Sequence, residues 1–292
     1  MRTFPCVTID VFTRQALAGN QLAVFTDARG LSDAEMQSLA RETNLSETTF
    51  VFPRDQKTEQ EQGVRVRIFT VAEELPFAGH PTLGTAFVLR GAGREEKVEL
   101  DLHIGKIPVR FSQKDGALFG EMTQRDPEFG NIFSREQVAN AVGLAADDIE
   151  LDLPIQSVST GVAFAILPVR SLVALRSINF EWRRAEQFLE SSDAKFFYLV
   201  CRETESPAAR LHARMLFYQG EDPATGSAAG CAAAWMVKHG VAKADEQVMI
   251  EQGIETKRPS EIFVRAGQSD GGVSNVRVGG FAVEVMRGQV SI

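Results

Sequence analysis

Two short segments, roughly half the chain apart, contain the residue types that could bind a small anion. Gly79-His80 and Gly226-Ser227 each precede a run of small or apolar residues, which predicts the start of a buried helix. The first N–H groups of a helix have no partner within it, and the helix dipole places positive potential at that end. A substrate carboxylate is therefore a natural occupant of both helix starts. The alternative is that the glycines only allow tight turns and that His80 and Ser227 only cap their helices.

Two acidic residues could add proton transfer to these helix starts. Glu47 lies between an expected helix end and an apolar strand, where partial burial would suit it for exchanging a proton. A glutamate at such a position is also commonly a solvated charge that ends a helix. Asp222 lies just before the second helix start. We take Glu47 and Asp222 as candidate catalytic residues, and Gly79, His80, Gly226 and Ser227 as candidate substrate-binding residues.

An internal repeat relates the two segments. Residues 67–80 align without gaps with residues 214–227, and two such copies fill the chain. The period is far longer than that of a solenoid, so the repeat predicts two similar lobes with any shared site at their seam. Residues kept in both copies, such as Glu74 with Glu221 and Pro76 with Pro223, are expected to be architectural. Residues that differ are expected to mark the site: Asp222 opposite Leu75, Ser227 opposite His80, and Ala194 opposite Glu47.

Each lobe is expected to consist of strands wrapped around one helix. The capping box Ser32-Asp33-Ala34-Glu35 predicts the start of an amphipathic helix. The helix from Ser227 to His239 has small residues on every face of its first turns, which predicts that it lies buried inside its lobe. Strands are predicted at 8–12, 21–25, 48–52, 64–69, 98–102, 107–111, 161–169, 196–200 and 213–217, with other helices from about 80, around 182–189 and after 134.

These elements group into two expected domains. The N-terminal lobe is expected over residues 1–125 and the C-terminal lobe over residues 126–292, with the polar segment 113–131 as the linker between them. A final strand near residues 281–292 could cross back to the first lobe.

The composition indicates a globular protein without nucleic-acid or membrane partners. The 292 residues are 44% hydrophobic and 24% charged, which are ordinary globular values. The net charge of −8 and the lack of a basic block weigh against nucleic-acid binding. The sequence has no apolar run of bilayer-crossing length, and its first residues alternate like a strand rather than forming a signal peptide. We therefore expect a cytoplasmic protein.

The cysteines and histidines indicate neither a metal site nor a cofactor. Cys6, Cys201 and Cys231 are odd in number and widely spaced, which predicts small buried hydrophobic residues rather than disulfides or zinc ligands. The four histidines lack the spacing of a helical metal pair. The sequence also has no GxGxxG motif after a strand and no lysine in its nearest approach to a phosphate loop, so we expect no nucleotide cofactor.

Several motifs together resemble the phenazine-biosynthesis PhzF-like family. They are residues 44–48 (Asn-Leu-Ser-Glu-Thr), 74–82, 221–228, Gly19-Asn20, Glu251-Gln252-Gly253 and Arg258-Pro259-Ser260, and the resemblance runs essentially end to end. It implies an α+β fold of the diaminopimelate epimerase-like type, with two pseudo-symmetric lobes that each wrap a mostly antiparallel sheet around a central helix. It also implies a homodimer and a metal-free, cofactor-free isomerisation by proton transfer. Glu47 matches the family's acid and base, while His80, Asp222 and Ser227 match its other site positions.

Two features limit what the resemblance implies. Related amino-acid epimerases place a cysteine at each helix start, whereas residues 77–78 and 224–225 contain none, which disfavours racemisation by two thiols. Thr256-Lys257 stands where the resemblance leads us to expect Met-Gly, near the expected mouth of the site. The identity of the substrate therefore stays open.

The leading hypothesis is an isomerase that moves a proton, and with it a double bond, on a small carboxylate-bearing substrate such as a cyclic dihydro-hydroxy amino acid. Glu47 would remove the proton and return it at another carbon, while His80 and Asp222 would orient amino or hydroxyl groups. This hypothesis requires the two helix starts to face one another across one cleft, with Glu47 and Asp222 on its walls. The alternatives are an amino-acid epimerase or racemase-like enzyme and a non-catalytic protein that binds an acidic metabolite.

Overall fold

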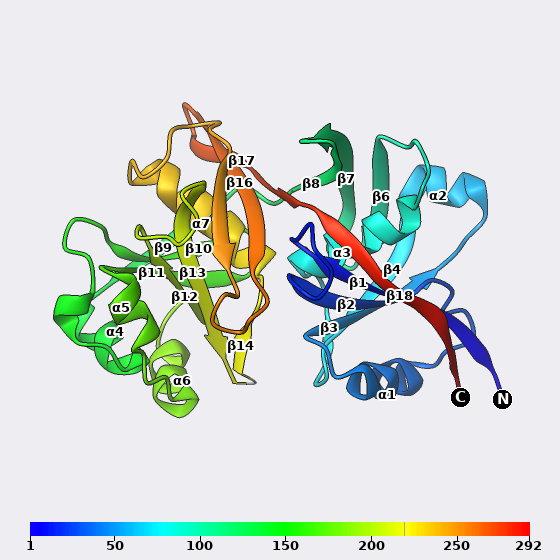
Figure 1. Cartoon of the computed structure of the whole chain (residues 1–292), viewed down its shortest axis with the longest axis horizontal. Coiled ribbons are helices and arrows are strands. Elements are labelled where there is room, and N and C mark those ends of the chain that lie inside the picture. The colour runs from blue at the N-terminus through cyan, green and yellow to red at the C-terminus, as the bar shows by residue number, and fades with distance from the viewer. Residues whose placement is uncertain (219) are drawn as a thin grey trace. The chain divides into compact units, whose positions relative to one another are not determined.

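The computed structural model describes residues 1–218 and 220–292, and the chain forms two compact units (Figure 1). The first unit contains Met1–Thr123 and Gly279–Ile292, and the second contains Gln124–Val278. Gln219, which belongs to the second copy of the repeat, lies outside the described residues. None of the helices within the described ranges combines the length and the apolar character that a bilayer crossing requires.

The first unit is built on a mostly antiparallel sheet. In spatial order its strands are β18 (Ala282–Ser291), β1 (Thr3–Val11), β2 (Asn20–Phe25), β3 (Glu47–Phe52), β4 (Val64–Phe69), β6 (Lys97–Leu102), β7 (Gly105–Lys114) and β8 (Ala117–Thr123). The pairs β2–β3 and β4–β6 are parallel, and the others in this series are antiparallel. The short strand β5 (Glu74–Leu75) pairs with β4. The last strand of the chain therefore lies beside the first.

The central helix of the first unit is α3 (Gly79–Arg90). It contacts β1, β2 and β6, and its residues from Gly79 to Phe87 are buried. A Cβ atom at Gly84 would lie 2.7 Å from side-chain atoms of both Leu22 and Val11, so the absence of a side chain at Gly84 lets these strands pack closely. The other helices of the unit are α1 (Asp33–Thr43), which begins with the predicted Ser32–Glu35 capping box, and α2 (Gln56–Gln62).

The second unit repeats this plan. Its strands in spatial order are β9 (Glu128–Phe133), β10 (Ile155–Ser159), β11 (Ala163–Val169), β12 (Phe196–Cys201), β13 (Ala209–Phe217), β15 (Val248–Gln252) and β16 (Ser260–Ser269), with β14 (Gly220–Asp222) paired to β13 and β17 (Gly272–Gly280) following β16 in the chain. The pairs β11–β12 and β13–β15 are parallel.

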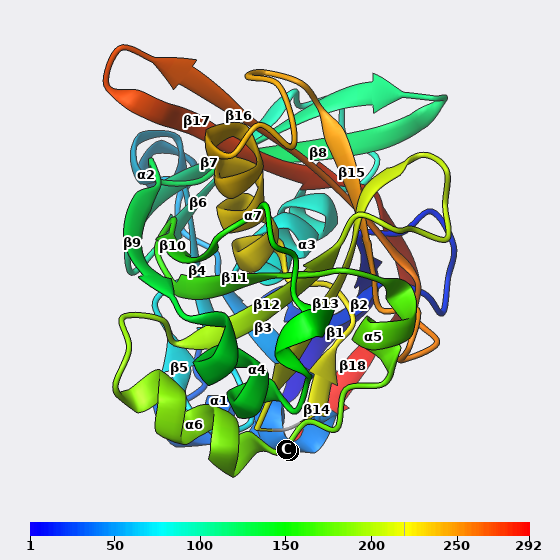
Figure 2. The same ribbon diagram turned by 90° about the vertical axis from the view of Figure 1, so that its left-hand side faces the viewer.

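A buried helix again lies within these strands. The helix α7 (Gly226–Lys238) contacts β10, β11 and β16, among which Figure 2 shows it, and most of its residues are buried. The prediction that the small-residue helix lies inside its lobe is therefore confirmed. The remaining helical segments are α4 (Arg135–Val142), the 3₁₀ turn η1 (Ala146–Asp148), α5 (Leu172–Arg176) and α6 (Trp182–Glu190).

The two copies of the repeat form the same elements in the same order, which are β4, β5 and α3 in one unit and β13, β14 and α7 in the other. Each copy also contains the same bidentate ion pair. Arg67 donates to Glu74 at 2.7 and 2.5 Å, and Arg214 donates to Glu221 at 2.9 and 2.7 Å. The prediction that these glutamates are architectural is confirmed, because each one ties the hairpin before its central helix.

The predicted boundary between the two units falls inside the segment 113–131, but this segment is not the polar linker that we expected. It contains the end of β7, all of β8 and the start of β9, and the two units divide between Thr123 and Gln124 inside it. The reason is that the glycines Gly120 and Gly130, which favoured a linker, lie within β8 and β9, and that β8 contains buried apolar residues such as Phe119 and Met122. A glycine within a strand is readily taken for a loop signal when only the sequence is considered.

Candidate active site

In the first unit, Glu47 and His80 lie in contact. Glu47 is the first residue of β3 and follows Asn44, whose left-handed conformation (φ 50°) ends α1 and turns the chain toward the strand. His80 is the second residue of α3 and is 4% exposed. Glu47 Oε2 lies 3.4 Å from His80 Nδ1, and the Glu47 side chain is 15% exposed. Glu47 is therefore not the solvated, helix-ending charge of the alternative interpretation.

His80 is neutral in the folded protein. Burial lowers the pKa of His80 to about 3, and the bond to the Gln21 carbonyl opposes only part of this effect. The Gln21 oxygen can only accept, so Nε2, which lies 3.3 Å from it, holds the ring proton and Nδ1 is an acceptor. An ion pair with Glu47 would need a charged imidazole, which this low pKa opposes. The contact is therefore one between a carboxyl group and a neutral imidazole.

Asn20 is a further member of this cluster, which sequence reasoning noted only within a motif. It is the first residue of β2, is 1% exposed, and places Nδ2 3.3 Å from His80 Nδ1. Gly19 has a φ of 68°, and a Cβ atom there would lie 2.3 Å from the Val11 carbonyl oxygen. This turn therefore requires glycine, and the turn places Asn20 against the histidine.

In the second unit, Asp222 lies at the entry to α7. It is the last residue of β14 and is 9% exposed. Its Oδ2 accepts a hydrogen bond of 2.6 Å from the Thr225 hydroxyl. Gly226 and Ser227 are the next two residues and the first two of α7. Each unit thus brings together its own candidates: Glu47, Gly79 and His80 in the first, and Asp222, Gly226 and Ser227 in the second.

His80 and Ser227 do not cap their helices. The N-cap residues are Ala78 and Thr225, and neither N-cap side chain accepts a hydrogen bond from its own helix in the described structure. Alanine offers no acceptor, and the Thr225 hydroxyl donates to Asp222 instead. The capping interpretation is therefore wrong. Two helix starts without an N-cap acceptor suit the binding of an anion.

The three cysteines are buried and reduced, as predicted. Burial raises the pKa of each thiol to about 11, so none is suited to act as a thiolate base at neutral pH.

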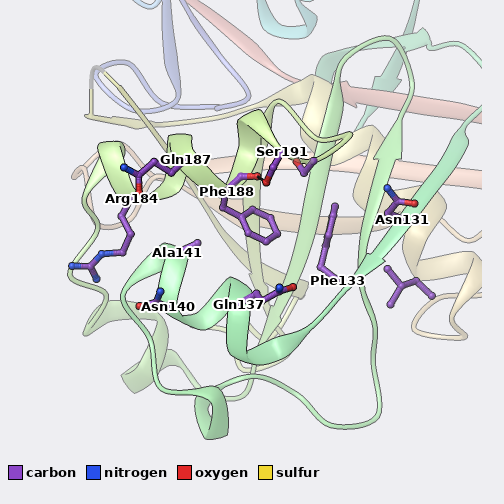
Figure 3. Close-up of a pocket in the computed structure, with 11 residues that line it drawn as sticks. Asn131, Phe133, Gln137, Asn140, Ala141, Arg184, Gln187, Phe188 and Ser191 are labelled. Atoms are coloured by element: carbon purple, nitrogen blue, oxygen red, sulfur yellow. Dashed lines mark hydrogen bonds between the residues drawn. The ribbon is translucent and has the colours of Figure 1, made fainter.

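A pocket of about 560 Å³ in the second unit is formed by β9, α4 and α6 and contains no candidate residue (Figure 3). Its polar lining consists of the amides and hydroxyls of Asn131, Gln137, Asn140, Gln187, Ser191 and Ser192, and of Arg184, which pairs with Glu181. These groups can bind a ligand but cannot take a proton from carbon. The acidic candidates Glu47 and Asp222 lie instead near the starts of α3 and α7.

The fold and the residues at the helix starts define a class of protein. The fold is of the α+β, diaminopimelate epimerase-like type, with a central helix in each of two similar units, and the protein is an isomerase. The chain belongs to the phenazine biosynthesis-like protein family, the PhzF family, whose family model matches residues 9–288.

Individual relatives agree with this assignment. The chain is 38% identical to an uncharacterised isomerase of Mesorhizobium japonicum over 100% of both chains. It is 33% identical to the trans-2,3-dihydro-3-hydroxyanthranilate isomerase of Pseudomonas aeruginosa over 94% of both. A solved structure of a PhzF-family phenazine biosynthesis protein from Bacillus anthracis superimposes with a TM-score of 0.88, at 26% identity and 100% coverage of both chains.

Thr256-Lys257 stands where the resemblance predicts Met-Gly, and residue 257 nevertheless has the backbone conformation that glycine favours. Lys257 has a φ of 60°, in the left-handed region that glycine adopts readily and lysine seldom does. The turn is closed by the Thr256 hydroxyl, which donates to the Gly253 carbonyl at 2.9 Å. The difference therefore changes the side chains at this turn rather than the path of the chain.

Proposed function

We propose that this isomerase moves a proton between two carbons of a small carboxylate-bearing substrate, with a shift of a double bond, and that Glu47 is its acid and base. The observation that supports this most is the contact between Glu47 and a neutral, buried His80 at the start of α3. A carboxyl group beside a neutral acceptor can gain and lose a proton without creating a buried charge on its neighbour.

In the proposed reaction, the Glu47 carboxylate removes a proton from a carbon next to a double bond. The C–H electron pair forms the new double bond, and the electrons of the old one move to the far carbon. Glu47 then returns the proton to that carbon, so atoms and charge balance within one substrate molecule. His80 stays neutral and accepts a hydrogen bond from the protonated Glu47.

The remaining candidates are proposed to bind the substrate. The backbone N–H groups at Gly79, His80, Gly226 and Ser227 would hold the carboxylate, and Asp222 would accept a hydrogen bond from an amino or hydroxyl group. This proposal includes the expectation that both helix starts face one cleft. The named activity of the Pseudomonas aeruginosa relative supports a cyclic dihydro-hydroxy amino acid as the class of substrate.

The test of the acid and base is Glu47→Gln, which keeps the size of the side chain and removes its ability to take a proton. We expect turnover of trans-2,3-dihydro-3-hydroxyanthranilate to fall by at least ~10², because general acid–base catalysis typically contributes that much. Substrate binding should remain measurable by calorimetry. Glu42→Gln, at an exposed position of α1, is the matched control. Near-normal turnover by the Glu47 variant would remove Glu47 from the mechanism.

Incubation in D₂O separates the proposal from its two alternatives. The isomerase places a hydrogen at a new carbon, which is either deuterium from the solvent or the proton that it removed, and it also moves the double bond. NMR detects both changes. An epimerase instead abolishes the optical activity of an enantiopure substrate and leaves the double bond in place. A non-catalytic binder saturates with ligand and shows neither change.

We also propose that the protein acts as a homodimer in the cytoplasm, which the resemblance to the family supports. Light scattering coupled to size-exclusion chromatography tests the first part, since a monomer at micromolar concentration would contradict it. Cell fractionation tests the second.

A further inference from the structure

Gln252 links the turn that contains Asp222 to the core of the second unit. It is the last residue of β15 and is completely buried. Its Nε2 donates to the Asp222 carbonyl at 2.8 Å and to the Thr225 hydroxyl at 3.0 Å. Its Oε1 accepts from the Thr225 backbone N–H at 3.1 Å and from the Tyr198 hydroxyl at 3.0 Å. The amide thus forms four hydrogen bonds, which use both donors and both lone pairs.

These partners fix the direction of the network. A backbone N–H can only donate and a carbonyl can only accept, so the contacts with Thr225 N and Asp222 O determine which end of the Gln252 amide is nitrogen. Because that nitrogen donates to the Thr225 hydroxyl oxygen, the hydroxyl hydrogen is directed to Asp222 Oδ2, 2.6 Å away. The side chains form one chain of donors that runs from Tyr198 through Gln252 and Thr225 to Asp222.

Neighbouring residues hold the same turn from the other side. The Ser260 hydroxyl donates to the Pro223 carbonyl at 2.9 Å. Gly253 has a φ of 77°, and a Cβ atom there would lie 2.4 Å from the carbonyl oxygens of both Pro223 and Arg258. Gln252, Gly253 and Ser260, from two of the motifs noted in the sequence, therefore hold residues 222–225.

The first unit differs at the corresponding position. Val64 pairs with Leu100 in the parallel strands β4 and β6, as Leu211 pairs with Ile250 in β13 and β15. Since Val64 and Leu211 correspond in the repeat, the counterpart of Gln252 is Leu102, which is a buried apolar residue. Gln252 thus occurs in the unit that contains Asp222. The first unit has Leu75 in place of Asp222 and Leu102 in place of Gln252.

We propose that Gln252 is a positioning residue for the isomerisation, which sets the orientation of the Asp222 carboxylate through the Thr225 hydroxyl. The inference rests on the proposed role of Asp222 in binding the substrate. Two hydrogen bonds fix Asp222, one to its backbone carbonyl and one to a carboxylate oxygen, so few rotamers of its side chain remain. The carboxylate would therefore be oriented before the substrate binds.

A pair of variants at Thr225 tests this orientation. Thr225→Val keeps the shape and removes the donor, whereas Thr225→Ser keeps the donor. We expect crystal structures to show the Asp222 carboxylate rotated in the valine variant and unmoved in the serine variant. With trans-2,3-dihydro-3-hydroxyanthranilate, kcat should fall ~10-fold or more for valine and stay within about 2-fold for serine, since a misplacement of about 1 Å can cost up to 10² in rate.

A matched pair of glutamine variants tests Gln252 itself. Gln252→Leu introduces the residue of the first unit, and Gln156→Leu makes the same change at a buried glutamine of β10 that bonds Gly130 and His239. Both changes should lower the melting temperature, but only the first should rotate Asp222 and lower kcat. An unmoved Asp222 carboxylate in Thr225→Val and Gln252→Leu would overturn the inference, whether or not this substrate is turned over, and the Thr225 pair decides if Gln252→Leu does not fold.

Asp222→Asn distinguishes this inference from the proposed function. If Gln252 acts through Asp222, adding Gln252→Leu to Asp222→Asn should lower kcat by less than about 2-fold, because coupled residues are not additive. Full activity of Asp222→Asn alone would contradict the proposed role of Asp222. A large loss in Asp222→Asn together with normal kcat in Gln252→Leu would contradict only the positioning role.

Discussion

His80 and Ser227 occupy the same position in the two central helices but offer different chemistry. The serine has a hydroxyl group that can donate or accept, while the histidine is held neutral by burial and presents Nδ1 as an acceptor beside Glu47. Asn20 and Gln21 determine this state, because the first faces Nδ1 and the second accepts from Nε2. The repeat thus keeps the helix start and changes the group at the proposed substrate-binding position.

The depressed pKa of His80 predicts that acid destabilises the protein. The unfolded histidine is protonated below its ordinary value of 6.5, whereas the folded one stays neutral until about 3. Stability is therefore fully present above pH 6.5 and falls by about 1.4 kcal/mol for each pH unit of acidification below it. Urea unfolding between pH 7 and pH 5 measures this slope. His80→Gln should reduce the slope by that amount, and an unchanged slope would contradict the assignment of a neutral histidine.

At the scale of elements, the central helices need residues that strands can approach closely. Gly84 in α3 and the run of alanines in α7 meet this need, because a helix enclosed by its sheet has no polar face to present. The same helices begin at the candidate site, so the packing that buries each helix also fixes the position of its N-terminus.

Gly84→Ala tests this packing. In an exposed helix the change would stabilise by up to about 1 kcal/mol through helix propensity. Here the new methyl group would lie 2.7 Å from buried atoms of Leu22 and Val11, so we expect a loss of about 1–3 kcal/mol in urea unfolding. Combining it with Val11→Ala should cost less than the sum of the single changes, because the smaller residue makes room. If Gly84→Ala instead increases the free energy of unfolding, the strands move to accommodate the methyl group and the prediction is contradicted.

At the scale of the whole molecule, we expect the two units to respond to pH in opposite directions, because the pKa of His80 is lowered and that of His212 is raised. In the second unit His212 is fully buried, with Nδ1 2.8 Å from Glu251 and Nε2 3.1 Å from Glu255, which also pairs with Arg176. Burial alone would lower the pKa of His212, but the bonds from Glu255 and Glu251 outweigh it and raise the pKa above 6.5. At the equivalent position in the first unit, an arginine replaces the histidine, and Arg65 lies 3.6 Å from Asp101.

The raised pKa of His212 predicts a loss of stability on the alkaline side. Its contribution is fully present below pH 6.5 and is lost as the pH rises through the raised pKa, at up to about 1.4 kcal/mol per pH unit. Both tryptophans, Trp182 and Trp235, belong to the second unit, so fluorescence reports on its unfolding. His212→Gln should lower stability at pH 6 and remove the alkaline slope, while His80→Gln should leave that slope intact. An alkaline slope that persists in His212→Gln would contradict the prediction.

Much of this protein could be predicted from neighbouring residues alone. The capping box of α1, the strand β4 and the start of the small-residue helix α7 follow from local periodicity and end signals. The repeat separated Arg67 and Glu74, which are architectural, from the positions proposed as the site. Strands such as β8 and β9 were not predicted, because each contains a glycine, Gly120 or Gly130, and glycine in a sequence is typical of turns and loops.

The sequence by itself determined the two-copy plan, the buried helices and the candidate residues at their starts, because these depend on spacing and residue type. Only the tertiary structure decided that Asn20 faces the ring of His80, that Gln252 orients Thr225, and that His212 lies between two glutamates. These partners come from different strands, and their meeting depends on strand pairing and register. A hydrogen bond forms only when two atoms lie about 3 Å apart, and spacing along the chain does not specify that distance.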